Sequence, residues 1–178
     1  MPEGPSIVIL KEAVDSFVGK KIIKASGNTK KLNFGRLHGT NIQDFKSWGK
    51  HFLICLPGFT IRIHFLMFGS YRIDDENPNA IPRLSLTFSK KQRLNFYTCG
   101  LSVIEGPLDE VYDWTADVMN PKWSSRKASL KLKLRPETLV CDALLDQGYF
   151  QACAISLRTR FCSGSGFIRK AKLEIYPH

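Results

Sequence analysis

The segment from Thr60 to Phe65 alternates apolar and polar side chains, and this feature constrains the fold more than any other. Successive side chains of a β-strand point to opposite faces, so the alternation predicts a strand with one face in a core. Stretches of similar β-branched and aromatic character recur around it, separated by turn signals such as Pro57-Gly58. We expect strands at 21–25, 42–48, 51–56, 60–65, 69–73, 83–88, 93–97 and 101–104.

Helical patterns flank these strands. Ile7, Leu10, Val14 and Phe17 recur at helical spacing and predict a helix over 6–17. The polar stretch 74–82 holds two prolines and predicts a surface loop. After Pro107 the pattern indicates helices at 124–134 and 136–147. The expected fold class is therefore α+β: an N-terminal helix with a two-layer antiparallel β-sandwich, followed by the start of a helical domain.

The charge of the chain favours a polyanionic partner. Its net charge is +10 and its pI is near 9.5, which is typical of proteins that bind nucleic acid, although a merely basic surface would look the same. No apolar run approaches the roughly 20 residues of a membrane span, and no basic segment precedes an apolar one at the N-terminus. We expect a cytoplasmic protein.

The cysteines do not suggest a disulfide framework or a metal site. There are five of them, an odd number, and none is spaced as Cys-x-x-Cys. We expect free thiols and no metal ligands.

The N-terminal Pro2-Glu3 pair carries candidate chemistry. Removal of the initiator methionine would leave Pro2 with a free secondary amine, and an α-amino group has a pKa near 8, so much of it is nucleophilic near neutral pH. Its attack on C1′ of a deoxyribose would expel a damaged base and leave an iminium, which acidifies the neighbouring sugar proton and permits strand cleavage by elimination. Glu3 would act as a general acid or base at the sugar ring oxygen. The ordinary alternative is a glutamate that stabilises the start of a helix.

Four motifs occur in order over residues 1–147 and give these residues a context. They are Met1-Pro2-Glu3-Gly4-Pro5, Trp48-Gly49-Lys50-His51-Phe52-Leu53, His64-Phe65-Leu66-Met67-Phe68-Gly69-Ser70 and Asp142-Ala143-Leu144-Leu145-Asp146-Gln147. The combination resembles the formamidopyrimidine-DNA glycosylase / endonuclease VIII family of base-excision enzymes.

This resemblance implies roles for seven residues. Pro2 would be the nucleophile, Glu3 the acid/base, and Lys50 a group that holds the phosphate beside the lesion. Leu66, Met67 and Phe68 would form an apolar wedge that fills the space left by an everted nucleotide, because flipping a base costs a few kcal/mol of stacking. The implied catalytic set is Pro2, Glu3 and Lys50, and the implied DNA contacts are Lys50, His64, Leu66, Met67 and Phe68. Ordinary core packing is the alternative for the apolar triplet.

The chain departs from the family pattern at two places. Ser6 stands where the family has a second glutamate. This difference affects the hydrogen-bond network expected around the active site, but not the nucleophile. The resemblance implies that residues 111–147 begin a helix–two-turn–helix domain that is truncated here: after Gln147 the second helix of that unit and the family's zinc finger are not recognisable. Codons that begin at the third base of each residue from Gly148 onwards permit the family text Asn-Ile-Ile-Lys-Asn-Glu, so we expect a frameshift, a disordered tail over 148–178, and neither zinc nor any other cofactor in this chain. A divergent C-terminus is the alternative.

The resulting hypothesis is a DNA glycosylase with AP-lyase activity that removes oxidised bases and is impaired by the aberrant tail. The expected domains are a catalytic β-sandwich over 1–110, the start of a helical DNA-binding domain over 111–147, and the tail. The expected partner is damaged double-stranded DNA, with a monomer, no membrane, and a bacterial-type, nucleoid-associated location. Two alternatives remain: a non-catalytic basic DNA-binding module, and an RNA-binding β-domain that would lack the usual aromatic runs. The N-terminal motif and the apolar triplet lean toward endonuclease VIII and oxidised pyrimidines.

Overall fold

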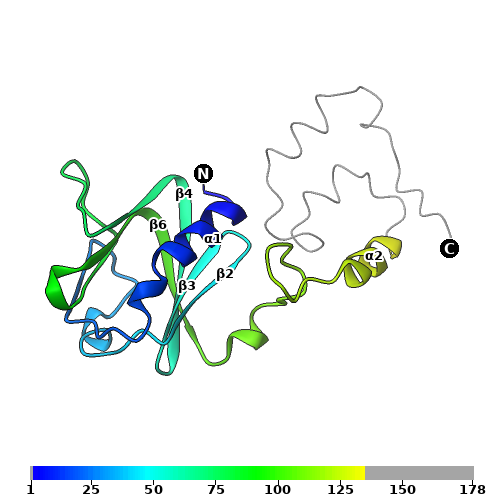
Figure 1. Cartoon of the computed structure of the whole chain (residues 1–178), viewed down its shortest axis with the longest axis horizontal. Coiled ribbons are helices and arrows are strands. Elements are labelled where there is room, and N and C mark those ends of the chain that lie inside the picture. The colour runs from blue at the N-terminus through cyan, green and yellow to red at the C-terminus, as the bar shows by residue number, and fades with distance from the viewer. Residues whose placement is uncertain (1, 135–178) are drawn as a thin grey trace. The chain divides into compact units, whose positions relative to one another are not determined.

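The computed structural model describes residues 2–134, apart from the side chain of Leu132. The chain divides into two compact units, 1–108 and 109–178. The first holds one helix and six strands, and the described part of the second holds one helix (Figure 1). The elements are α1 (Gly4–Ala13), β1 (Lys24–Ser26), β2 (Asp44–Trp48), β3 (His51–Leu56), β4 (Phe59–Ile73), β5 (Leu84–Thr87), β6 (Arg93–Glu105) and α2 (Ser125–Lys133). Short 3-10 turns lie at Asp15–Phe17, Phe34–Arg36, Ser89–Lys91 and Leu108–Glu110.

The six strands form one antiparallel sheet in the order β1-β5-β6-β4-β3-β2. The two long strands, β4 and β6, belong to both halves of it, and their register shifts between Phe65 and Ser70. The early part of β4 pairs with β3, whereas its late part lies beside the portion of β6 that pairs with β5. The rings of Phe52 on β3 and Phe96 on β6 meet at 5.9 Å, which joins the two halves face to face. The expected helix and two-layer sandwich are confirmed.

Two pairs of expected strands are single strands in the structure. The segments 60–65 and 69–73 are both part of β4, and 93–97 and 101–104 are both part of β6. The expected gaps were residues 66–68 and 98–100, but a β-bulge lets β4 continue through the first of them.

The core lies between the layers and under α1. Helix α1 packs on β2 and β3 (Figure 1) and buries Ile7 and Leu10. Six phenylalanines are almost completely buried, and each stabilises the fold by about 1.5–3 kcal/mol relative to an exposed side chain; they are Phe17, Phe45, Phe52, Phe65, Phe88 and Phe96. This packing fixes the N-terminal end of α1 relative to the β2–β3 hairpin.

The described part of the second unit ends in α2. The Ser124 hydroxyl accepts a hydrogen bond from the Lys127 N–H at 3.3 Å, as an N-cap residue does. Lys131 lies 3.5 Å from the carboxylate of Asp113. The helix expected over 124–134 is therefore present, whereas the helix expected over 136–147 and the tail over 148–178 lie outside the described residues. Within residues 2–134, no helix has the length and apolar character needed to span a membrane.

Candidate functional site

Glu3 is positioned by the start of α1. It immediately precedes the helix with an extended backbone, and Pro5 occupies the first helical turn, where a missing N–H is tolerated. The Glu3 side chain makes no capping hydrogen bond to the helix. Its Oε1 instead lies 3.7 Å from Nζ of Lys50, with 20% of the glutamate and 13% of the lysine side chain exposed. The carboxylate therefore faces Lys50 and does not cap the helix.

Lys50 is held by the tip of the β2–β3 hairpin. Trp48 and His51 are paired across the hairpin, so Gly49 and Lys50 form a two-residue loop. Gly49 has a φ of 54°, a conformation that glycine adopts without a steric penalty and that tight hairpins require. The tight loop directs Lys50 toward the beginning of α1, and sequence positions 3 and 50 meet as a result.

Two histidines stand beside this lysine. His51 is opposite His64 in the β3–β4 register, their rings meet edge to face at 5.5 Å, and Trp48 stacks on His51 at 5.7 Å. Burial, Arg62 and His64 lower the pKa of His51 to about 4. Burial, Lys50 and Arg62 likewise lower the pKa of His64, and a hydrogen bond to the Lys50 backbone opposes this shift. Both imidazoles are therefore neutral near pH 7, next to the side chains of Lys50 and Arg62.

His64 also has an unused polar atom. Its Nδ1 is buried and has no hydrogen-bond partner among the described residues. A buried polar nitrogen without a partner is costly, so this edge of the ring is suited to a ligand that supplies one.

The apolar triplet that follows His64 is exposed. Leu66, Met67 and Phe68 expose 49%, 69% and 81% of their surface, whereas Phe65 exposes 2%. The triplet lies where β4 loses its register with β6, and the β-bulge turns these side chains away from the core. Core packing, the alternative considered for these residues, is excluded for all three.

The structure thus brings together Glu3, Lys50 and His64, with half-buried Pro2 next to Glu3 along the chain. Ser6, where a second glutamate was expected, is exposed. Sequence reasoning did not single out Arg62, Trp48 or His51. Arg62 could have been found, because alternation along the strand places it on the same face as His64. Pairing His51 with His64 required the hairpin register.

We found no metal centre in the part of the chain that the structure describes: no group of three or more His, Cys, Asp or Glu side chains could hold an ion there. Cys55 and Cys99 are buried free thiols. Burial raises the pKa of Cys99 to about 11, which keeps this thiol protonated and chemically quiet. The site consists of an amine, a carboxylate, a lysine and imidazoles.

Comparison with known proteins supplies the context of this site. Residues 1–98 match the family model described as the formamidopyrimidine-DNA glycosylase N-terminal domain. The chain is 25% identical over 227 residues to endonuclease 8-like 2 of Bos taurus, an alignment that covers 84% of this chain and 68% of that protein.

Two solved structures share the fold. A viral DNA glycosylase superposes with a TM-score of 0.75 at 18% identity, covering 89% of this chain and 68% of that one. The Lactococcus lactis Fpg in complex with DNA containing an abasic site superposes with a TM-score of 0.74 at 16% identity, covering 90% and 65%. The chain therefore spans about two thirds of the length of these proteins.

Proposed function

The chain belongs to the formamidopyrimidine-DNA glycosylase family, and from this membership we propose that it is a DNA glycosylase of base-excision repair that cleaves through its N-terminal proline. The observation that carries the proposal is the meeting of Glu3 and Lys50 at the start of α1, directly beside Pro2. The proposed partner is damaged duplex DNA, and the proposed substrates are oxidised bases.

In the proposed reaction, Pro2 supplies the electrons for the first bond. Once Met1 is removed, the lone pair of the Pro2 nitrogen attacks C1′ of the damaged nucleotide. The glycosidic C–N bond breaks, and the base leaves with the electrons of this bond and takes up a proton. The nitrogen loses its own proton, and the C1′–O4′ bond then opens to an iminium. Glu3 donates a proton to O4′ as the ring opens.

The second half of the reaction is an elimination. The iminium acidifies the C2′ proton, a base removes it, and the C3′–O bond to the phosphate breaks, so the strand is cut. Lys50 would hold the phosphate beside the lesion, which is consistent with its place 3.7 Å from Glu3. In the free protein the Glu3 carboxylate balances the charge of this largely buried lysine.

Leu66, Met67 and Phe68 would occupy the place of the everted nucleotide. Their exposure on a rigid β-strand supports this role, because a wedge must be present before the DNA arrives and must not belong to the core. Filling the vacated space would offset part of the few kcal/mol that unstacking costs.

We also propose that this chain is a weaker enzyme than a version carrying the family's text after Gln147. The family's second phosphate grip, including its asparagine, would be restored by a single-base shift of the reading frame at that point. Restoring it should raise cleavage of damaged DNA by orders of magnitude.

Borohydride trapping on abasic duplex DNA tests the chemical proposal. Reduction of a Pro2 iminium yields a stable covalent adduct, whereas a non-catalytic DNA-binding module yields none. A variant that retains one extra residue before Pro2 keeps the fold but not the secondary amine, and it should give no adduct. Undiminished trapping by this variant would exclude Pro2 as the nucleophile.

A further inference from the structure

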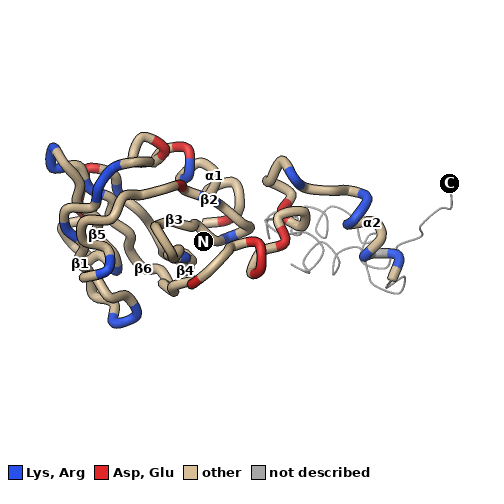
Figure 2. The backbone as a smooth tube through the Cα atoms, turned by 90° about the horizontal axis from the view of Figure 1, so that it is seen from below, with Lys and Arg blue, Asp and Glu red and all other residues tan. Residues whose placement is uncertain are grey.

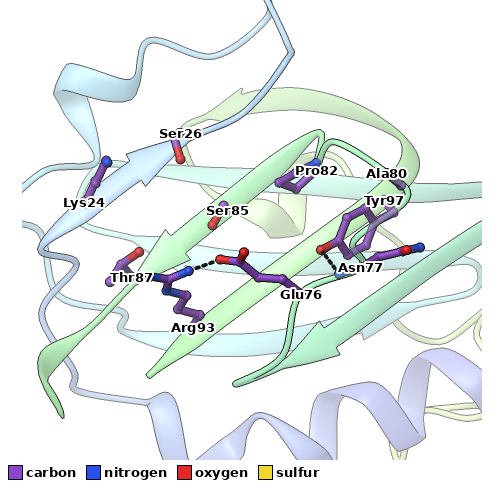
Figure 3. A pocket seen from close by; sticks show the side chains of 10 residues that line it. All are labelled: Lys24, Ser26, Glu76, Asn77, Ala80, Pro82, Ser85, Thr87, Arg93 and Tyr97. Atoms are coloured by element: carbon purple, nitrogen blue, oxygen red, sulfur yellow. Dashed lines mark hydrogen bonds and ion pairs between the residues drawn. The ribbon is translucent and has the colours of Figure 1, made fainter. Parts of the chain in front are cut away.

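A polar cavity lies on the half of the sandwich formed by β1, β5 and β6, outside the residues assigned to the proposed reaction. Its volume is about 290 Å³, near the lower end of small-molecule sites. Figure 3 shows its wall: side chains of β1, β5 and β6, closed on one side by the loop 74–82. Figure 2 shows Lys and Arg residues gathered in the segments around β1 and β5.

The loop is pinned over the sheet, which makes the cavity preformed. Tyr97 accepts a hydrogen bond on its hydroxyl from the Asn77 N–H at 3.0 Å, and Asn95 donates to the Asp75 carbonyl at 2.7 Å. Asp74 accepts from the Arg93 N–H at 2.7 Å. A ligand would therefore meet a formed wall and would not have to order a free loop.

One end of the cavity is rich in hydrogen-bond donors. Lys24, Thr87 and Arg93 lie in one row across three strands, and Ser26 and Ser85 lie opposite each other in a second row. In the part of the chain that the structure describes, Lys24 forms no ion pair, and the hydroxyls of Ser26, Ser85 and Thr87 have no hydrogen-bond partner. An ammonium group with adjacent hydroxyls is the donor set that binds a phosphate.

The opposite end is different. Pro82, Ala80 and the ring of Tyr97 stand there, next to the Asn77 amide (Figure 3). An apolar wall with one amide suits a flat heterocycle that also carries polar edges. Ser26 and Ser85 lie between the two ends, where a sugar would present its hydroxyls (Figure 3).

We propose that this cavity binds a nucleoside monophosphate, with its phosphate at Lys24 and Thr87 and its base against Pro82. The nucleotide can be free or can be the phosphorylated end of a strand, since both present the same chemistry. Glu76 also lines the cavity, where its carboxylate forms an ion pair with Arg93 (Figure 3) and thereby limits the positive charge of this site. The inference does not rest on the proposed glycosylase activity, because it uses none of the same residues.

Calorimetric titration of the full chain with a nucleoside 5′-monophosphate, at fixed ionic strength, tests the proposal. Lys24→Ala should weaken binding roughly 10-fold or more, since it removes a charged hydrogen bond. Lys21→Ala removes the same charge from an exposed residue outside the cavity and should change binding less than about twofold. Glu76→Gln should tighten binding, because it releases Arg93.

The outcomes separate the alternatives. Equal weakening by the two lysine variants would mean general charge attraction and would overturn the site, as would no binding at millimolar nucleotide. Inorganic phosphate that binds as tightly as the nucleotide would overturn the assignment of the base end. A 5′-phosphorylated single strand that competes with the mononucleotide, when its unphosphorylated counterpart does not, would identify the strand end as an accepted source.

Discussion

The carboxylate of Glu3 lies 3.7 Å from the ammonium of Lys50, although 46 residues separate them along the chain. Neither residue belongs to the body of a helix or strand: one precedes α1 and the other forms part of a hairpin loop. The core packing of α1 against β2 and β3 brings the two ends together. The pair can therefore be perturbed with little change to the core.

A double-mutant cycle should detect the pair in the free protein. Combining Glu3→Gln with Lys50→Met should give a coupling energy of about 0.5–1 kcal/mol, the upper range for pairs that are not fully buried. Urea unfolding of the four proteins measures it. A coupling energy of zero would show that the two groups do not interact in solution.

The salt dependence of DNA binding should identify the phosphate contact. Lys50→Ala should lower affinity for all sequences and reduce the slope of log K against log salt concentration by about one. Lys46→Ala, in the same hairpin, removes the same charge and should leave the slope nearly unchanged. Equal slopes for the wild type and the Lys50 variant would contradict the assignment.

The wedge and the core should respond oppositely to the same substitution. Phe68→Ala should change the free energy of unfolding by less than about 0.5 kcal/mol, since its ring is 81% exposed, while base release from duplex DNA falls. Phe65→Ala removes a buried ring three residues earlier and should cost about 3–5 kcal/mol. Denaturation measures the stability of both variants, and a base-release assay on duplex DNA measures their activity. Unimpaired base release by the Phe68 variant would exclude a wedge role for Phe68.

The stability of the fold should fall in mild acid because of His51. Its pKa is about 4 in the folded state and near 6.5 in an unfolded chain, so between these values only the unfolded chain takes up the proton. Above pH 6.5 the ring is neutral in both states and its ionisation does not affect the free energy of unfolding. As the pH falls from 6.5 toward 4, protonation of the unfolded chain lowers this free energy. His64, whose pKa is also lowered, acts in the same direction.

Urea unfolding midpoints measured from pH 7.5 to 4.5 test this pH dependence of stability. His51→Gln should flatten the profile, whereas substitution of the exposed His38 should not. Identical profiles for the wild type and the His51 variant would refute the argument.

Gly69 should be far less replaceable than Gly100. A β-carbon at Gly69 would lie 2.7 Å from Cβ of Phe65 and 2.9 Å from the Thr98 carbonyl, so the bulge that carries the exposed triplet 66–68 would have to move. Gly69→Ala should cost about 1–3 kcal/mol and weaken DNA binding. At Gly100 the nearest atom is 3.7 Å away, an ordinary contact, and Gly100→Ala should be nearly neutral in unfolding experiments. Similar losses for both variants would contradict the steric argument.

Much of the fold could be predicted from local pattern. The strand β3 matches its expected range of 51–56. The helix expected over 6–17 is α1 followed by a 3-10 turn at Asp15–Phe17. The continuity of β4 could not be predicted, because it depends on β6 pairing on both sides of the bulge, a contact between distant segments.

For the candidate site too, the sequence identifies individual residues but not the contacts between distant segments. The motifs around Lys50 and His64 single out these residues as candidates, and alternation along the strand places Arg62 on the face of His64. That Lys50 meets Glu3, and that Trp48 and His64 both contact His51, depends on the hairpin register and the packing of α1. The roles assigned to these residues, and the domain boundaries expected near 110 and 147, stay predictions.

Because β4 and β6 run through both layers, neither layer can melt while the other stays folded. Each long strand contributes to both halves of the core, so opening one half removes the partners of the other. The sandwich should therefore unfold as one cooperative unit, with amide protons on both sides of the bulge exchanging at the same slow rate. The exposed triplet Leu66-Met67-Phe68 lies on one of these strands, so its backbone stays ordered as long as the domain is folded, although its side chains face water.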